Sequence, residues 1–273
     1  MSSSSDSLRV SSLFGVQGKV ALVTGGSKGI GLMITRGLAA NGVKVYISSR
    51  SKEDCQEAAD SLNKEYGEGS VVPIPEDLST EQGCRSLVER LQGPEHGVQQ
   101  LHLLVNNAGA NWGAPLAEYP DAAWDKVLAL NLKSVFHLTR LAVPLLRAAA
   151  SPQDPARVIN VGSINGLAVP FLETYAYSAS KAAVHHLTRT LANRLAPWSI
   201  TVNAIAPGPF ESKMMKATLD KFRDHIVKSI PLSRIGEPSD VAGVTLFLSS
   251  PAGAYLTGTI IPLDGGALIK ARL

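Results

Sequence analysis

The chain has 273 residues, 45% of them hydrophobic and 18% charged, a composition typical of globular α/β proteins. Its 26 Lys and Arg outnumber its 23 Asp and Glu by only three, and these charges are scattered, which argues against nucleic acid or a membrane surface as a partner. The two cysteines, Cys55 and Cys84, stand at no metal-ligand spacing and form no disulfide framework, so we expect a reducing compartment and no metal.

The N-terminal stretch MSSSSDSLRVSSLF lacks the apolar core of a secretory signal, and no apolar run approaches the roughly 18 residues of a membrane span. We therefore expect a cytoplasmic protein. Residues 1–17 are predicted to be a disordered tail. Residues 18–273 contain no long linker and no internal repeat, and are predicted to form one domain.

Short apolar runs alternate with longer helical patterns. In chain order, the pattern predicts a strand at Val20–Thr24, a helix at 30–41, a strand at Val43–Ser48, a helix at 53–66, a strand at Val71–Ile74, a helix at 81–91 and a strand at Leu101–Val105. It then predicts a long helix at 122–150 with a kink or break at Pro144, a strand at Val158–Val161, a helix at 178–195, a strand at Thr201–Ile205, a helix at 239–248 and a short strand near 258–262. Because the strands are apolar throughout, they indicate a doubly wound, Rossmann-type parallel α/β sheet with helices on both faces.

The stretch VALVTGGSKGIG, from Val20 to Gly31, places closely spaced glycines between the first strand and the first helix. This is where doubly wound sheets hold a dinucleotide pyrophosphate, facing the N–H groups of the helix start. Gly25 allows the turn, Gly29 lets a phosphate approach the backbone, and Gly31 permits close helix packing. Alone the pattern is weak, since a tight turn has the same glycines.

Further motifs follow in register with the strands. In chain order they are Asn106-Asn107-Ala108-Gly109, Asn131, Ser163, Tyr177-Ser178-Ala179-Ser180-Lys181, Pro207-Gly208 and the segment from Ile230 to Leu263-Asp264-Gly265-Gly266. Together with the glycine spacing, they resemble the short-chain dehydrogenase/reductase family across nearly the whole chain. Within that family the sequence looks most like the β-ketoacyl reductases of the rhamnolipid-synthesis type.

Tyr177 and Lys181 are four residues apart, so on a helix they share one face. The resemblance implies that Tyr177 is the catalytic acid/base and Lys181 its helper. A phenol has a pKa near 10, and we expect Lys181 and a positive nicotinamide to lower it. Tyr175 is the rival tyrosine, but four residues on it meets Ala179.

The resemblance also implies roles for residues that the pattern alone leaves open. Ser163 would donate a hydrogen bond to the reacting carbonyl, although a serine there is also typical of a turn cap. Asn131 would complete the catalytic set, although a helical asparagine more often binds backbone. The expected cofactor contacts are Gly25, Ser27, Lys28, Gly29, Ile30, Gly31, Arg50, Asp77, Leu78, Asn107, Ala108, Gly109, Tyr177, Lys181, Pro207 and Gly208.

The second strand ends without the carboxylate that typically binds the ribose 2′-hydroxyl of NAD. Lys28 precedes Gly29, and Arg50 follows the strand. Two cations and no anion favour a 2′-phosphate, so we expect NADP(H) as the cofactor.

Taken with the resemblance, these residues predict an NADPH-dependent reductase of an apolar or bulky ketone, possible substrates including 3-oxoacyl groups, with Tyr177 as proton donor. Two alternatives remain: a non-catalytic NADP-binding sensor or scaffold, and a dehydratase or epimerase on the same fold. We also expect a homo-oligomer, a tetramer by resemblance, because 127–146 and 182–195 carry apolar residues on more than one face.

Overall fold

The computed structural model describes residues 8–270, and its centre is one seven-stranded sheet in which every neighbouring pair of strands is parallel. The strand order is β3-β2-β1-β4-β5-β6-β7. The strands are β1 Val20–Thr24, β2 Lys44–Ser48, β3 Val71–Pro73, β4 Leu103–Asn106, β5 Ala156–Val161, β6 Ile200–Pro207 and β7 Ile260–Leu263. The predicted Rossmann-type fold is confirmed.

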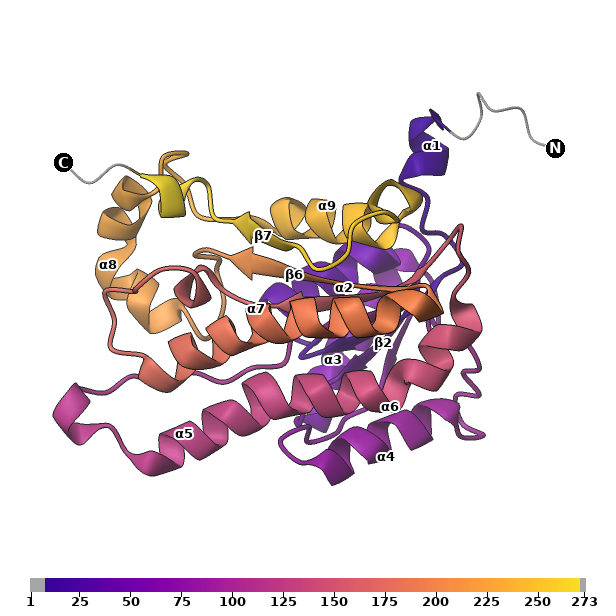
Figure 1. Cartoon of the computed structure of the whole chain (residues 1–273), viewed down its shortest axis with the longest axis horizontal. Coiled ribbons are helices and arrows are strands. Elements are labelled where there is room, and N and C mark those ends of the chain that lie inside the picture. The colour runs from indigo at the N-terminus through magenta and orange to yellow at the C-terminus, as the bar shows by residue number, and fades with distance from the viewer. Residues whose placement is uncertain (1–7, 271–273) are drawn as a thin grey trace.

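Helices cover both faces of the sheet (Figure 1). They are α1 Val10–Leu13, α2 Gly29–Ala39, α3 Lys52–Tyr66, α4 Glu81–Gln92, α5 Asp121–Leu128, α6 Ser134–Ala149, α7 Tyr175–Leu195, α8 Lys216–Ser229 and α9 Pro238–Ser249. One apolar core joins the sheet to α2, α3 and α9, and a second joins it to α4, α6 and α7. Along β1, Val23 belongs to the first core and Leu22 to the second, because successive strand residues point to opposite faces.

The long helix predicted at 122–150 is interrupted, but not at Pro144. A π-helical turn, Ala129–Lys133, separates α5 from α6, and α6 runs on through Pro144. The side chain of Asn131, inside this turn, accepts a hydrogen bond from the N–H of Ala110 at 2.7 Å and donates one to its carbonyl at 2.9 Å. A π-helical turn contains one more residue than an α-helical turn. Here it occurs where these hydrogen bonds join the helix to the segment after β4.

The predicted disordered tail, residues 1–17, is wrong for its second half. Residues 10–13 form α1, the ring of Phe14 lies 6.4 Å from that of Phe247 on α9, and Val16 is only 2% exposed. Burial of Val16 and the ring contact of Phe14 hold the end of this segment against the protein. Residues 1–7 lie outside the described residues.

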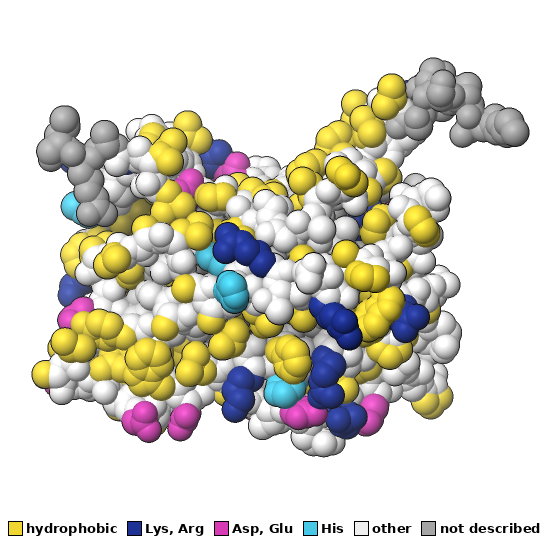
Figure 2. All heavy atoms as spheres, in the orientation of Figure 1, with side chains coloured by type: hydrophobic (Ala, Val, Ile, Leu, Met, Phe, Trp, Pro, Cys, Tyr) yellow, Lys and Arg dark blue, Asp and Glu magenta, His cyan; other side chains and the backbone are white. Residues whose placement is uncertain are grey.

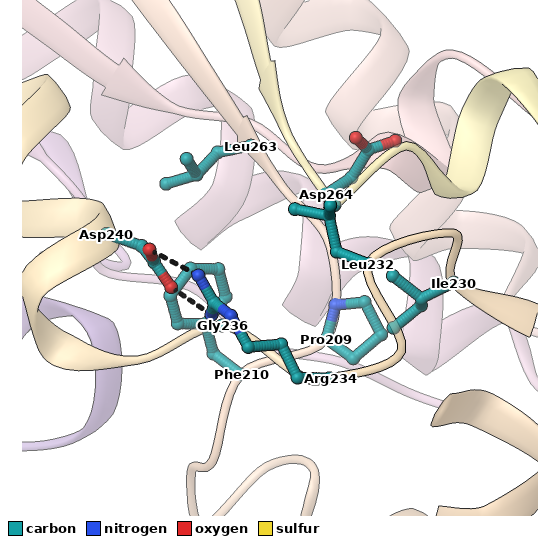
Figure 3. A pocket seen from close by; sticks show the side chains of 10 residues that line it. Pro209, Phe210, Ile230, Leu232, Arg234, Gly236, Asp240, Leu263 and Asp264 are labelled. Atoms are coloured by element: carbon teal, nitrogen blue, oxygen red, sulfur yellow. Dashed lines mark hydrogen bonds and ion pairs between the residues drawn. The ribbon is translucent and has the colours of Figure 1, made fainter. Parts of the chain in front are cut away.

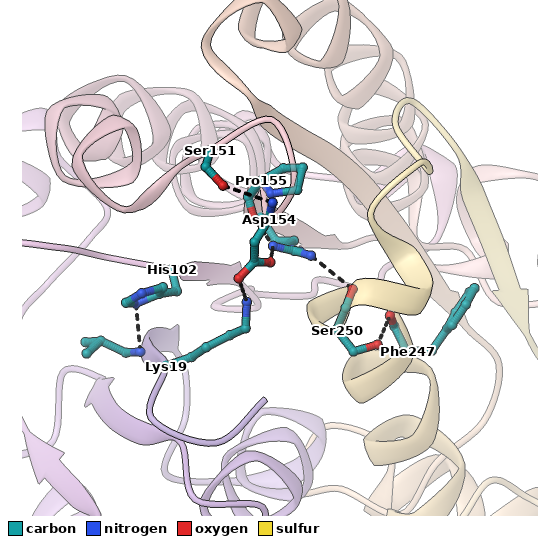
Figure 4. A network of polar contacts seen from close by, with 9 residues as sticks. Lys19, His102, Ser151, Asp154, Pro155, Phe247 and Ser250 are labelled. Carbon is teal, nitrogen blue, oxygen red and sulfur yellow. Dashed lines mark hydrogen bonds and ion pairs between the residues drawn. The ribbon is translucent and has the colours of Figure 1, made fainter. Parts of the chain in front are cut away.

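A charged network ties the amino ends of β1 and β5 together (Figure 4). Arg157, which is 1% exposed, pairs with Asp154 and donates a hydrogen bond to the carbonyl of Ser250 at 3.0 Å. Lys19 contacts the same carboxylate at 2.6 Å. The network stands at the edge of the sheet opposite to the carboxyl ends of the strands.

At the carboxyl ends, β1 and β4 lie side by side while their following helices cover opposite faces. This divergence leaves the crevice where open α/β sheets bind ligands. At the bottom of this crevice, Thr24 joins the end of β1 to the segment after β4. The Thr24 hydroxyl accepts hydrogen bonds from the N–H groups of Asn107 and Ala108, both at 2.9 Å. Between residues 8 and 270, no helix is both long and apolar enough to cross a membrane.

Candidate active site

The glycine turn between β1 and α2 has the geometry that close approach of a ligand requires. Gly25 and Gly29 have φ values of 63° and 53°, in the left-handed region that favours glycine. A Cβ on Gly31 would lie 2.1 Å from the carbonyl oxygen of Gly25, so the first turn of α2 packs directly on the loop. Among the described side chains, none caps the start of α2, and its N–H groups face the crevice end of β1.

The segment after β6 lies over this glycine turn. A Cβ on Gly29 would come within 3.1 Å of the Cβ of Ser212, and one on Gly208 within 2.9 Å of the Cα of Asp264. A cleft of about 780 Å³ extends from Gly29 and Ser212 between α2 and α8. The predicted cofactor residues Pro207 and Gly208 thus stand across the crevice from the turn.

A smaller cavity of about 90 Å³ lies behind the same segment (Figure 3). Pro209, Phe210 and Leu263 are among its walls, and the carboxylate of Asp240 receives two hydrogen bonds from Arg234 at 2.6 and 2.9 Å beside it. This volume is too small for a dinucleotide or a long substrate.

Ser163, Tyr177 and Lys181 come together beyond the carboxyl end of β5. The Ser163 hydroxyl lies close enough to the Tyr177 hydroxyl to lower the pKa of the phenol, and the Lys181 nitrogen lies 5.5 Å from the centre of the Tyr177 ring. Lys181 is 5% exposed and donates a hydrogen bond to the carbonyl of Val161 at 2.8 Å. α7 begins at Tyr175, three residues earlier than predicted, which puts Tyr177 and Lys181 on successive helical turns.

The pKa values of this group differ from our expectation. Burial raises the pKa of the Tyr177 phenol, and the nearby Ser163 hydroxyl offsets only part of that rise. Burial likewise lowers the pKa of the Lys181 ammonium to about 8. In the protein alone, Lys181 does not lower the Tyr177 pKa, because loss of water around the phenolate is the largest influence; the expected lowering also counted on a positive nicotinamide.

Asn131 lies beside the same group. It is 1% exposed, its Nδ2 donates to the Ser180 hydroxyl at 3.0 Å, and its Oδ1 would lie 3.3 Å from a Cβ on Gly109. That Cβ would also be 3.8 Å from the Lys181 nitrogen. The π-helical turn thus brings Asn131 next to the lysine. The oxygen and the nitrogen of its side-chain amide are both hydrogen-bonded within the protein.

The rival tyrosine points elsewhere. The hydroxyl of Tyr175 donates a hydrogen bond to Glu173 at 2.6 Å, and its ring packs edge-on against Tyr119. The neighbouring carboxylate raises the pKa of Tyr175. Throughout residues 8–270, no group of three or more His, Cys, Asp and Glu side chains is placed to hold a metal ion.

At the end of β2 the structure adds an anion that the sequence reasoning missed. The carboxylate of Asp54, in the first turn of α3, lies 2.5 Å from the Lys28 nitrogen. Arg50 is exposed, and the Ser27 hydroxyl is hydrogen-bonded to that of Ser49 at 3.0 Å. Only the position of Asp54, three residues after the cap Ser51, could have indicated a side chain directed toward the glycine turn.

The remaining predicted cofactor residues also make contacts within the protein or lie at its surface. Asn107 donates to the carbonyls of Thr24 and Gly25 at 2.8 and 3.2 Å, and so holds the glycine turn against β4. Asp77 is exposed and accepts the N–H of Ser79 at 3.0 Å. Leu78 is 3% exposed, and its side chain belongs to the core. Ile30 and Ala108 pack partly against the two cores.

Taken together, these features define a Rossmann-type dinucleotide-binding protein with a Ser–Tyr–Lys group at the carboxyl edge of its sheet. A family model described as short chain dehydrogenase matches residues 19–222, and the chain belongs to that family of enzymes. The resemblance stated from the motifs is confirmed.

Two curated relatives and one solved structure illustrate the range of the family. Over 255 residues the chain is 45% identical to the rhamnolipids biosynthesis 3-oxoacyl-[acyl-carrier-protein] reductase of Pseudomonas aeruginosa, covering 93% of this chain and 97% of that protein. It is 35% identical to a tropinone reductase homolog of Arabidopsis thaliana, over 93% of both chains. The RhlG/NADP active-site complex of Pseudomonas aeruginosa matches with a TM-score of 0.88 at 44% identity, over 93% of this chain and 98% of that one.

Proposed function

We propose that the protein reduces a ketone with NADPH and that Tyr177 donates the proton to the carbonyl oxygen. The approach of the Ser163 hydroxyl to the Tyr177 hydroxyl carries this proposal, because two neighbouring donors can both bind one carbonyl oxygen. Ser163 steadies the oxygen as negative charge develops. Lys181 supplies a positive charge beside the phenol, and Asn131 fixes the backbone next to the lysine.

The residues at the crevice fit NADP(H), which supplies the hydride when bound. The uncapped start of α2 and the glycine turn would hold the pyrophosphate, while Lys28 and Arg50 would hold the 2′-phosphate. Residues 207–212 would lie along the nicotinamide half. The NADP complex of the similar Pseudomonas aeruginosa protein supports this cofactor.

Two alternatives from the sequence are less well supported. A cofactor-binding sensor or scaffold has no need for a phenol beside a serine hydroxyl and a buried lysine. A dehydratase or epimerase on the same fold would not consume NADPH in step with an added ketone. Steady oxidation of NADPH with turnover of a ketone therefore separates the reductase from both.

The substrate side of the crevice favours an apolar ketone. Phe171, in the loop before α7, is 62% exposed and lies edge-on to Phe222 of α8 at 5.9 Å between ring centres. Leu219 and Ile226 of α8 are buried in a separate small core, where they pack the helix, and Leu219 also borders the cleft between α2 and α8. The relative in rhamnolipid synthesis is named for a 3-oxoacyl group, which has such an apolar chain.

The prediction of a homo-oligomer stays a prediction. Figure 2 shows hydrophobic side chains gathered on one face around α5 and the turn before it. Phe136 on α6 and Trp198 after α7 are 42% and 37% exposed, which is consistent with a surface that another copy covers.

Replacing Tyr177 by Phe tests the proposed function. Tyr177→Phe should bind NADPH as before but lose about 10²–10⁴-fold in kcat, because only the positioned acid is removed. Tyr175→Phe is the matched control, since its hydroxyl serves Glu173, and it should keep nearly full activity. Undiminished ketone reduction by Tyr177→Phe would disprove the assigned role.

A further inference from the structure

His185 lies directly beneath the turn that carries Ser163. It stands on α7 one helical turn after Lys181 and is 3% exposed. Its neighbour His186 is exposed. The ring nitrogens of His185 make no hydrogen bond of good geometry, only a weak approach to a backbone group of Gly166. A buried imidazole with so few polar contacts needs an explanation.

Two glycines on either side of Ser163 make room for this ring. A Cβ on Gly162 would lie 2.1 Å from the His185 Nε2, and a Cβ on Gly166 would lie 2.9 Å from its Cε1. Neither glycine has a positive φ, so the backbone conformation does not require glycine at these positions. Glycine is needed at both positions because the imidazole fills the space that a Cβ would occupy.

Hydrogen bonds within the Ser163 turn hold it together where it packs on α7. The N–H of Gly166 donates to the Ser163 carbonyl at 3.0 Å, and the Ser163 hydroxyl accepts the N–H of Asn165 at 3.2 Å. A Cβ on Gly166 would also lie 2.6 Å from the Lys181 carbonyl carbon. The turn therefore rests on the helix that bears Tyr177 and Lys181, with His185 as the side chain in the contact.

We propose that His185 is a positioning residue that sets the height of the Ser163 turn over α7, and so the alignment of the Ser163 and Tyr177 hydroxyls. The proposal rests on the proposed function of that pair. Burial, and then the charge of Lys181, lower the pKa of His185 to about 4, so the ring is neutral at neutral pH. A neutral ring fills the space without adding a second charge beside the lysine.

A double-mutant cycle with Ser163 tests this inference. Ser163→Ala should lower kcat by about 100-fold, and His185→Ala by about 10-fold, because a shift of the hydroxyl below 1 Å already impairs the reaction. If His185 acts through Ser163, the double variant should be no slower than Ser163→Ala, within about 2-fold. NADPH affinity, measured by direct binding, should stay within about 2-fold in all three variants. The pyrophosphate would bind at the glycine turn after β1, which none of these substitutions changes. His186→Ala is the matched control with unchanged kcat.

Gly162→Ala gives a second approach in case the cavity left by His185→Ala unfolds the protein. Its added Cβ would clash with the ring, so Gly162→Ala should lower kcat, and adding His185→Ala should restore part of that loss. Multiplicative losses in the Ser163 cycle, or wild-type kcat in a folded His185→Ala, would overturn the proposal. A Ser163→Ala variant with full activity would instead refute the proposed function on which it rests.

Discussion

The carboxylate of Asp54 lies 2.5 Å from the ammonium nitrogen of Lys28, across the mouth of the crevice where the adenosine end of a dinucleotide would lie. The side chains are 30% and 49% exposed, and the hydrogen bond from Lys28 is the main reason that the pKa of Asp54 is lowered. Such an exposed pair contributes little stability. Its importance is for binding, since a 2′-phosphate that reaches Lys28 must compete with this carboxylate.

We expect Asp54→Asn to improve the use of NADPH. Removing the carboxylate frees Lys28 and takes away a repelling charge, so KM for NADPH should fall by about 3-fold, while KM for NADH stays constant. Arg50→Ala should raise KM for NADPH by about 10-fold, because a charge-assisted bond to the phosphate is lost. Steady-state kinetics with both cofactors measure this. A wild type that prefers NADH would contradict the assignment of Lys28 and Arg50.

The rate of ketone reduction should fall as the pH rises through about 8. Burial lowers the pKa of Lys181 to about 8, so its ammonium is charged below that pH and lost above it. The raised pKa of Tyr177 keeps the phenol protonated over the same range, so deprotonation of the tyrosine does not cause this fall in rate. A profile of kcat/KM from pH 6 to 9.5 at saturating NADPH tests it. In Lys181→Met the residual rate should not vary as the pH rises through about 8. A wild-type rate that stays constant to pH 9.5 would show that deprotonation of Lys181 does not limit the reaction.

Phe222→Ala should change which ketones are preferred. The ring of Phe222 is 39% exposed and faces Phe171, whereas Ile226, four residues later on α8, is 4% exposed in the small core. Removing the exposed ring should lower kcat/KM for a long-chain 3-oxo ester by about 10-fold relative to a small charged oxo acid. Ile226→Ala should instead cost about 2–3 kcal/mol of stability and leave the ranking unchanged. A wild type that favours small charged oxo acids would rule out the apolar pocket.

Asp154→Asn should destabilise the fold by about 2 kcal/mol, because it leaves the buried Arg157 guanidinium without its anion. Burial alone would raise the pKa of Asp154, but the hydrogen bond from Lys19 and the charge of Arg157 outweigh it and the pKa is lowered. Its stabilising effect is therefore present above pH 4 and is lost as the pH falls through the lowered pKa.

Urea unfolding at pH 7 and at pH 3 measures this difference between wild type and Asp154→Asn, which should shrink at the lower pH. The exposed Asp60→Asn is the control and should stay within about 0.5 kcal/mol of wild type. Turnover at 25 °C should be unaffected by either change, since the network stands at the opposite edge of the sheet. Equal stability of Asp154→Asn and wild type at pH 7 would show that the network is not a tie between β1 and β5.

Local patterns predicted most of the architecture. Strand β1 has the bounds that its apolar run indicates, and the helix that bears Tyr177 and Lys181 differs only in where it begins. These features depend on residues close in the sequence, through strand burial and helical spacing. The interruption at Asn131 was missed, because it accompanies hydrogen bonds to Ala110, a residue on another segment.

The sequence by itself determined the doubly wound fold, the glycine turn and the pairing of Tyr177 with Lys181, because each is encoded in short-range spacing. Only the tertiary structure decided the protonation of that pair, since burial by distant segments sets the pKa values. It likewise brought Asp54 to Lys28 and His185 under Ser163. Contacts between segments far apart in the chain depend on how whole helices pack on the sheet, and no local pattern specifies that packing.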